Sequence, residues 1–229
     1  MELHLLPFYT ANILLLASFP VVLLAIRYAG SAAISLETQI LTLITFMLRY
    51  MDLHKNWQSH DTYRVAFKTT YISLATIIVV TLAAAKWHAG HRCAWPTLLI
   101  PIIVVSAVLA LPLRYKTTTI SGELFEFAWA MSEYLGGLAL LPQLIHSWTR
   151  RFLRRDGEGP IRVHRSIFVY LYVLLGHQLL YLINWTVKYF VNDTLDPIAA
   201  TSGSFRFASI IVFLARYAEH DSEGQVLLV

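Results

Sequence analysis

The sequence is poor in charge and in cysteine. Only 14% of its 229 residues are Asp, Glu, Lys or Arg, whereas 57% are hydrophobic, a balance far from that of a soluble globular domain. Cys93 is the single cysteine, so no internal disulfide can form. Proline and glycine are scattered and form no linker, which predicts one domain over residues 1–229. These properties predict an integral membrane protein whose surface contacts lipid.

Patterns typical of catalysis, metal binding and nucleic acid binding are also missing. No nucleophile elbow, phosphate loop or pair of catalytic carboxylates appears, so we expect no enzyme and no cofactor. His88, His91 and Cys93 have no recognisable fourth ligand, and we expect no metal. The net charge of +4 comes from basic residues that lie mostly between apolar runs, where they orient a membrane protein, so we expect no nucleic acid partner.

Seven apolar segments are long enough to cross about 30 Å of hydrocarbon as α-helices. They cover residues 11–27, 35–54, 65–85, 97–113, 124–146, 167–190 and 197–217. No basic segment precedes the first one, so we expect it to stay as a helix and not to be removed as a signal peptide. The loop of about 148–166 carries six arginines, which places it in the cytosol by the positive-inside rule. The N-terminus is then lumenal or extracellular, and the short tail of about 218–229 is cytosolic.

The two halves of the chain resemble each other weakly. The first and fifth segments each carry a proline near the cytosolic end, Pro20 and Pro142, and the helix after each ends in an aromatic and charged cluster. This pattern predicts an all-α membrane protein with two parallel three-helix repeats and a linker helix, as in SWEET-type and PQ-loop folds. A proline in a membrane helix permits a kink, so Pro20 and Pro142 are candidate hinges, with tolerated membrane prolines as the alternative.

Charged and aromatic residues gather at the lumenal ends of three predicted helices. Arg49 and Asp52 end the second helix, Trp129 lies in the first turns of the fifth, and Asn184 and Lys188 end the sixth. Arginine offers a two-pronged donor and lysine a point charge, so the set suits the anionic end of a peptide. The alternative is that Arg49 pairs with Asp52 three residues later and that Lys188 reaches the membrane interface.

Glu133 and His177 lie deep within predicted membrane spans, where ionisable residues are functional candidates. Burial favours the protonated form of a carboxylic acid, and histidine titrates near neutral pH. Both residues are therefore candidate proton sensors. The alternative is a neutral Glu133 hydrogen-bonded to a helix carbonyl, with His177 as a satisfied polar group of the core.

Four stretches, residues 34–53, 126–129, 141–144 and 181–185, resemble the KDEL-receptor (ER lumen protein-retaining receptor) family and follow its order. The most specific blocks are Arg-Tyr-x-Asp-Leu, which begins at Arg49, and Tyr-Leu-x-Asn-Trp, which begins at Tyr181. The Pro-Gln pair at Pro142 is shared by all PQ-loop proteins.

The resemblance implies a receptor of the ER and Golgi membranes that binds C-terminal tetrapeptide retrieval signals in the acidic Golgi and releases them in the neutral ER. The implied partners are these peptide signals and membrane lipid, with vesicle coat machinery a candidate partner of the cytosolic loops. Mapped position by position, the implied ligand-binding residues are Arg49, Asp52, Trp129, Tyr181, Asn184, Lys188 and Asp196.

Several positions depart from the family. Gly136 stands where the family has a buried glutamate and His177 where it has a tyrosine, so Glu133 and His177 are candidates to replace that proton-linked pair. Val212 replaces an aspartate, and no lysine follows Lys188, although the family has a coat-binding tail with lysines.

Two other functions stay open. A PQ-loop or SWEET-type small-solute transporter is the main alternative, because the same architecture serves permeation in those families. The polar residues cluster toward the lumen, whereas the cytosolic halves of the second and sixth helices are almost wholly apolar, which favours a blind pocket. The other alternative is a membrane scaffold that has lost its ligand.

Overall fold

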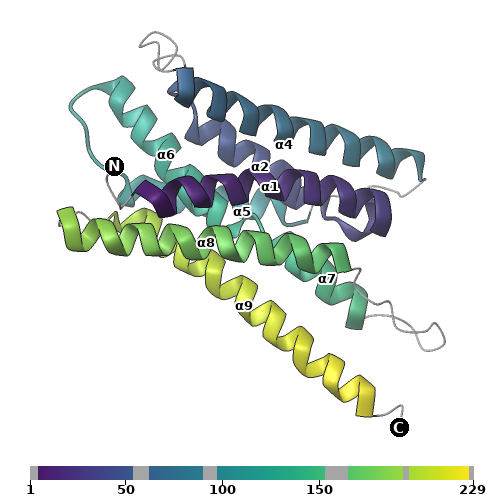
Figure 1. Cartoon of the computed structure of the whole chain (residues 1–229). Coiled ribbons are helices and arrows are strands. Elements are labelled where there is room, and N and C mark those ends of the chain that lie inside the picture. Colours follow the sequence, from purple (N-terminus) through teal and green to yellow (C-terminus); the bar gives the residue numbers. More distant parts are fainter. Residues whose placement is uncertain (1–4, 54–61, 90–96, 153–164, 193–195, 227–229) are drawn as a thin grey trace.

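The computed structural model describes residues 5–53, 62–89, 97–152, 165–192 and 196–226 (Figure 1). Within these residues all regular secondary structure is helical, as the sequence predicts. The α-helices are α1 (Leu5–Ala29), α2 (Leu36–Arg49), α4 (Thr62–His88), α5 (Leu99–Leu113), α6 (Ile120–Leu138), α7 (Leu141–Phe152), α8 (Arg165–Asn192) and α9 (Pro197–Val226), and a short 3-10 helix, η1, covers Ser31–Ala33.

Six predicted spans each correspond to one of these helices, and the fifth, 124–146, is divided. It is broken at Ala139 and Leu140 into α6 and α7. Pro142 is the second residue of α7, where a missing backbone N–H costs no helical hydrogen bond. Pro20, in contrast, lies inside the continuous helix α1. By length and composition, α1, α4, α8 and α9 contain segments able to cross a membrane.

Helix packing follows the same pattern in the two halves of the chain. In the first half α4 packs against α1 and α2, and in the second half α9 packs against α6 and α8. The halves meet where α1 lies along α8 and α2 lies along α6, and α5 packs mainly on α6. Figure 1 shows α1, α4, α6 and α9 running in one direction, with α2 and α8 running back. This is the arrangement of two parallel three-helix repeats with α5 as the linker helix.

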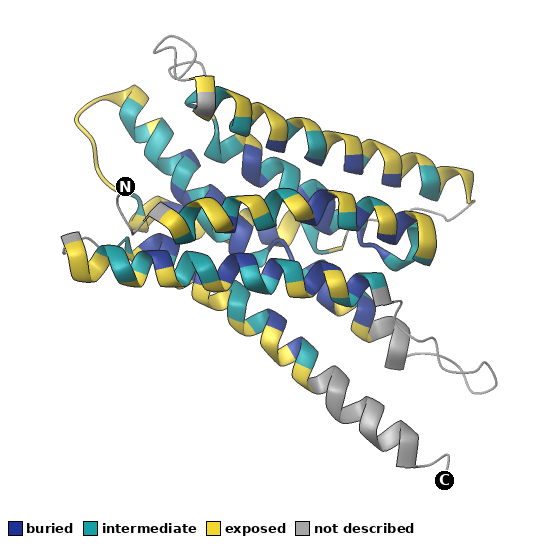
Figure 2. Ribbon diagram, in the orientation of Figure 1, coloured by how far each residue is buried: buried dark blue, intermediate teal, exposed yellow. Residues whose placement is uncertain are grey.

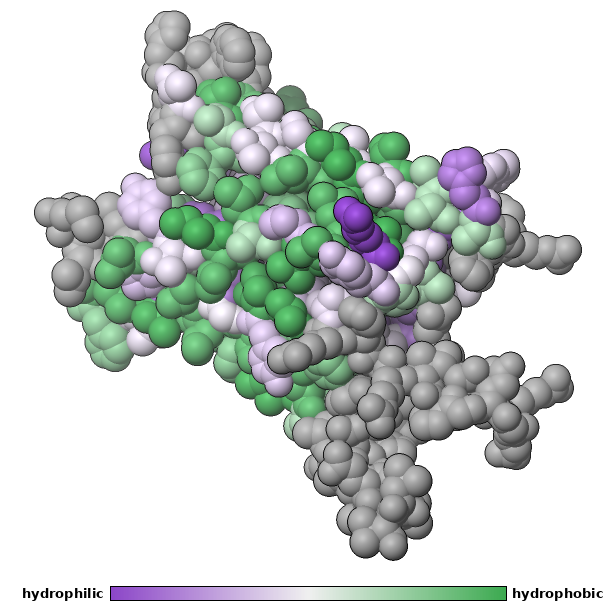
Figure 3. All heavy atoms as spheres, turned by 45° about the vertical axis from the view of Figure 1, so that its right-hand side comes forward, coloured by the Kyte–Doolittle hydropathy of each residue, from purple (hydrophilic) through white to green (hydrophobic). Residues whose placement is uncertain are grey.

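The largest apolar core lies between the helices of the two halves. In it Phe19 of α1, Phe46 of α2 and Tyr71 of α4 bring their rings together at centroid distances of 5.5 to 6.1 Å. Figure 2 shows buried residues on the sides of the helices that face one another and exposed residues along the outer side of α4. Figure 3 shows that apolar side chains cover much of the described surface on the face in view. Such a surface is stable only in contact with lipid.

The glutamine of the Pro-Gln pair joins the two halves of the chain. Gln143 of α7 is fully buried, and its Oε1 accepts a hydrogen bond from the Ser35 backbone N–H at 2.7 Å. Its Nε2 donates to the Ala33 carbonyl at 3.1 Å and to Ser147 Oγ at 3.0 Å. The N–H groups at the start of a helix lack partners within the helix, so this amide stabilises the turn from η1 into α2.

Candidate functional site

A cavity of about 590 Å³ lies among α1, α2, α4, α6, α8 and α9. Four of the predicted site residues line it: Arg49, Glu133, His177 and Tyr181. Several other polar residues of its lining are not among the predicted site residues: Asn12, Gln39, Arg64, Lys68, Gln178, Ser202 and Arg206.

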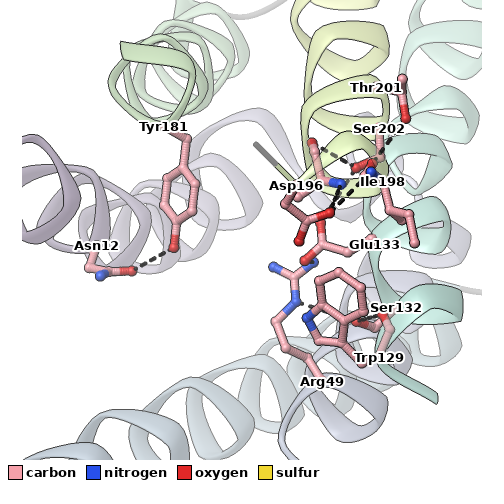
Figure 4. A network of polar contacts seen from close by, with 11 residues as sticks. Asn12, Arg49, Trp129, Ser132, Glu133, Tyr181, Asp196, Ile198, Thr201 and Ser202 are labelled. Atoms are coloured by element: carbon pink, nitrogen blue, oxygen red, sulfur yellow. Dashed lines mark hydrogen bonds and ion pairs between the residues drawn. The ribbon is translucent and has the colours of Figure 1, made fainter. Parts of the chain in front are cut away.

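Arg49 forms an ion pair with Glu133 inside this cavity (Figure 4). Arg49 is the last residue of α2, and its guanidinium lies 2.7 Å from Glu133 Oε1 of α6. The Arg49 Nε also donates to Ser132 Oγ at 3.4 Å, and Ser202 Oγ of α9 donates to Glu133 Oε2 at 3.4 Å. The side chains of Arg49 and Glu133 are only 27% and 13% exposed, so water screens the pair incompletely. The network ties α2, α6 and α9 together.

Asp52 pairs with a different cation. Both of its carboxylate oxygens lie 2.7 Å from Lys68 Nζ of α4, and that ammonium also lies 5.6 Å from the centre of the Tyr50 ring. The alternative pairing of Arg49 with Asp52 is therefore wrong. The reason is that α2 ends at Arg49, so Asp52 does not continue the helix face that would bring it under Arg49.

His177 and Tyr181 connect α8 with α1. His177 is buried, and its Nδ1 lies 2.9 Å from the Ala11 carbonyl oxygen. Its ring centre is 4.9 Å from that of Tyr181, whose hydroxyl donates to Asn12 Oδ1 at 3.4 Å. His177 is thus hydrogen-bonded within the core, as in the alternative considered from the sequence. Glu133 is instead ion-paired, and its carboxylate does not bond a helix carbonyl.

The other predicted ligand-binding residues, Asp52, Trp129, Asn184, Lys188 and Asp196, are not among the described residues that line the cavity. Trp129 stacks on Tyr115 at 6.0 Å, and the Tyr115 hydroxyl donates to Asp196 Oδ1 at 3.5 Å. Asp196 caps α9 by accepting from the N–H groups of Ile198 and Ala199 at 3.1 and 3.2 Å. Side chains at one membrane depth can lie on different sides of a helix, so only Arg49 and Tyr181 of the seven line this cavity, and ligand binding by the other five stays a prediction.

Asn184 is also buried, and its Oδ1 has no hydrogen-bond partner among the described residues. Lys188, four residues later on α8, is partly exposed. Of the residues that the sequence reasoning missed, Arg206 had the clearest signal, because it lies within the predicted seventh span and ionisable residues are rare there.

A carboxylate outside the predicted spans fixes the beginning of α6. Glu123 Oε1 accepts from the Thr117 backbone N–H at 2.7 Å, and Oε2 pairs with Arg114 Nε at 2.9 Å. These two partners hold the pKa of Glu123 below its usual value, with the backbone hydrogen bond as the larger cause. The Thr119 side chain caps the same helix by accepting from Gly122 N–H at 3.2 Å.

Comparisons of the sequence with known proteins all point to one family. The sequence pattern of the family described as "ER lumen protein retaining receptor" matches residues 30–188. An ER lumen protein-retaining receptor of Dictyostelium discoideum is 30% identical over 224 residues, which cover 96% of this chain and 97% of that protein. Another, of Caenorhabditis elegans, is 30% identical over 75% of this chain and 73% of its own length. One of Drosophila melanogaster is 29% identical over 86% of this chain and 84% of its own length.

Proposed function

Because the chain belongs to the ER lumen protein retaining receptor family, we propose that it binds C-terminal retrieval signals of lumenal proteins in the cavity beside Arg49 and returns them to the ER. The membership makes it a multi-pass receptor of the ER and Golgi membranes. Relatives named as receptors do not favour the transporter alternative.

The observation that carries this proposal is the charge of the cavity. Its described lining holds four cationic side chains, Arg49, Arg64, Lys68 and Arg206, against one carboxylate, Glu133. Its volume of about 590 Å³ is that of a typical site for a small ligand. A peptide that ends in a free carboxylate supplies the negative charge that this lining lacks, and a neutral solute does not.

The proposed roles of individual residues follow from their positions. Arg49 binds a ligand carboxylate through its two-pronged guanidinium once Glu133 releases it, and Tyr181 lies against the same space. Asp52 positions Lys68, which lines the cavity. We further propose a lumenal N-terminus and a cytosolic C-terminus, with the basic loop available to vesicle coat proteins.

Binding of a short peptide to the purified full-length protein tests the proposal. We expect a peptide ending in Lys-Asp-Glu-Leu to bind more tightly at about pH 5.5 than at about pH 7.4, and the same peptide with a C-terminal amide to bind much more weakly, because an amide cannot form the charged contact. Equal affinity for the two peptides, or no binding of either, contradicts the proposal.

A further inference from the structure

Arg206 is a cation of the cavity that has no hydrogen-bond or ion-pair partner among the described residues. It lies on α9, nine residues or about 13.5 Å along the helix from Pro197. It lines the cavity, and its Nε is buried without a hydrogen bond in the part of the chain that the structure describes. No ion pair reaches its guanidinium from those residues either.

The acids that contact the other cavity cations are already engaged. Glu133, the one carboxylate among the described lining residues, contacts Arg49 at 2.7 Å, and Asp52 contacts Lys68 at 2.7 Å. Arg206 cannot become neutral by losing a proton, because an arginine guanidinium stays charged in proteins. A buried charge without a counter-ion is costly, so the site around Arg206 favours an anion.

The surroundings of Arg206 offer further hydrogen-bond donors. The Tyr170 hydroxyl of α8 neighbours both Arg206 and Gln39. The Gln39 side chain is 5% exposed, and its Nε2 makes no hydrogen bond with the described residues. Two unpaired buried donors, one of them charged, therefore face one cavity, and a carboxylate has enough lone pairs to accept from both.

We propose that Arg206, together with Gln39 and Tyr170, forms a second anion site in the cavity and binds a carboxylate group. Arg49 and Arg206 then act on two different carboxylates of one ligand. That the carboxylate belongs to a peptide rests on the proposed function. A small free carboxylate such as acetate has the same chemistry and could bind at the same site.

The first arm of the test uses sodium acetate with the full-length protein in detergent at constant ionic strength. We expect acetate to raise the unfolding temperature of the wild type and to leave that of Arg206→Gln unchanged. Arg206→Gln removes a charge that has no partner in the described part of the chain, so the variant is expected to fold. Arg206→Lys keeps the charge without the planar fork and should recover part of the effect. Arg27→Gln is the matched control, because Arg27 is exposed at the end of α1 and does not line the cavity.

The second arm uses the Lys-Asp-Glu-Leu peptide and three versions that each lack one carboxylate: the C-terminal amide, Asp→Asn and Glu→Gln. We expect one of the three changes to weaken peptide binding to the wild type by about 30-fold or more, which is the smallest loss typical of breaking a buried charge pair. The same change should have little effect on binding to Arg206→Gln. This non-additivity identifies the carboxylate that Arg206 binds.

The two arms separate the inference from the proposed function. If acetate stabilises the wild type but not Arg206→Gln while no peptide binds, the anion site stands and the retrieval function fails. If only the peptides show the coupling, the site is specific for the peptide. The inference is overturned if acetate raises the unfolding temperature of the wild type and of Arg206→Gln equally and each of the three peptide changes weakens binding to both proteins by the same factor. This holds whatever the affinity of the unchanged peptide.

Discussion

Glu133 forms an ion pair with Arg49, the arginine that we propose for ligand binding, so replacing Glu133 by glutamine tests whether it competes with the ligand. The Arg49 guanidinium lies 2.7 Å from Glu133 Oε1. A ligand carboxylate can take that place only after the ion pair opens. Glu133→Gln keeps the shape of the side chain but removes its charge, so Arg49 is available without that cost.

The size of the effect follows from the geometry of the pair. A hydrogen bond between charged groups contributes about 1.5 to 3 kcal/mol net. We expect the lower part of this range, about 1.5 to 2 kcal/mol, because Arg49 is 27% exposed and water weakens the attraction. Since about 1.4 kcal/mol corresponds to a factor of ten, Glu133→Gln should tighten peptide binding by roughly 10- to 30-fold at neutral pH.

Charge sets the sign of the same effect: Glu133→Gln removes the carboxylate that holds Arg49, so the variant should bind an anionic ligand more tightly than the wild type does. We expect wild-type affinity to be higher at about pH 5.5 than at about pH 7.4, and the variants Glu133→Gln and His177→Phe test whether either residue carries that difference. His177→Phe should contribute less, because the His177 ring already bonds the Ala11 carbonyl at 2.9 Å, and the double variant should be no more than additive.

Isothermal titration with the Lys-Asp-Glu-Leu peptide between about pH 5.5 and 7.4 measures these affinities. Arg49→Ala is the control for the site: it should abolish binding, and Arg49→Lys should restore only part because the two-pronged geometry is lost. Unchanged affinity and pH slope in Glu133→Gln would refute competition by Glu133. Unchanged affinity in Arg49→Ala would show that Arg49 does not bind the ligand.

Two further predictions concern topology and packing. When only the plasma membrane is permeabilised, antibodies should reach an epitope tag at the C-terminus and another between Arg150 and Arg165, and lumenal protection of either tag would contradict the proposed orientation. Gly203→Ala should lower stability by about 1 to 3 kcal/mol, seen as a lower unfolding temperature in detergent, because its Cβ would lie 2.5 Å from Gln178 Nε2 and 2.7 Å from the Trp185 ring. Gly176→Ala is the matched control, since its Cβ would meet only Leu14 Cδ1 at 3.3 Å, and an equal loss there would mean that the close contact at Gly203 is not the cause.

The helical membrane class and the family could be predicted from the sequence alone. Hydropathy is a local property of each segment, so the spans were recognisable without any knowledge of their neighbours. The Arg-Tyr-x-Asp-Leu and Tyr-Leu-x-Asn-Trp blocks pointed to the family, and the match over residues 30–188 confirms it. The similarity of the two halves indicated the repeat, because each half carries the same order of proline and charged cluster.

The partners of the charged residues were decided only by the tertiary structure. Arg49 and Glu133 are 84 positions apart, and their contact depends on where α2 ends and which side of α6 faces it. The sequence places Trp129 and Asp196 at the same membrane depth as Arg49, but neither lines the cavity. Trp129 stacks on Tyr115, and Asp196 caps the first turn of α9. Arg206 was visible in the sequence as a cation within an apolar span, but only the packing of α8 and α9 showed that it lines the cavity and forms no ion pair with the described residues. A charge at a given depth is visible in one sequence segment, whereas its counter-ion is fixed by the rotation and crossing of several helices.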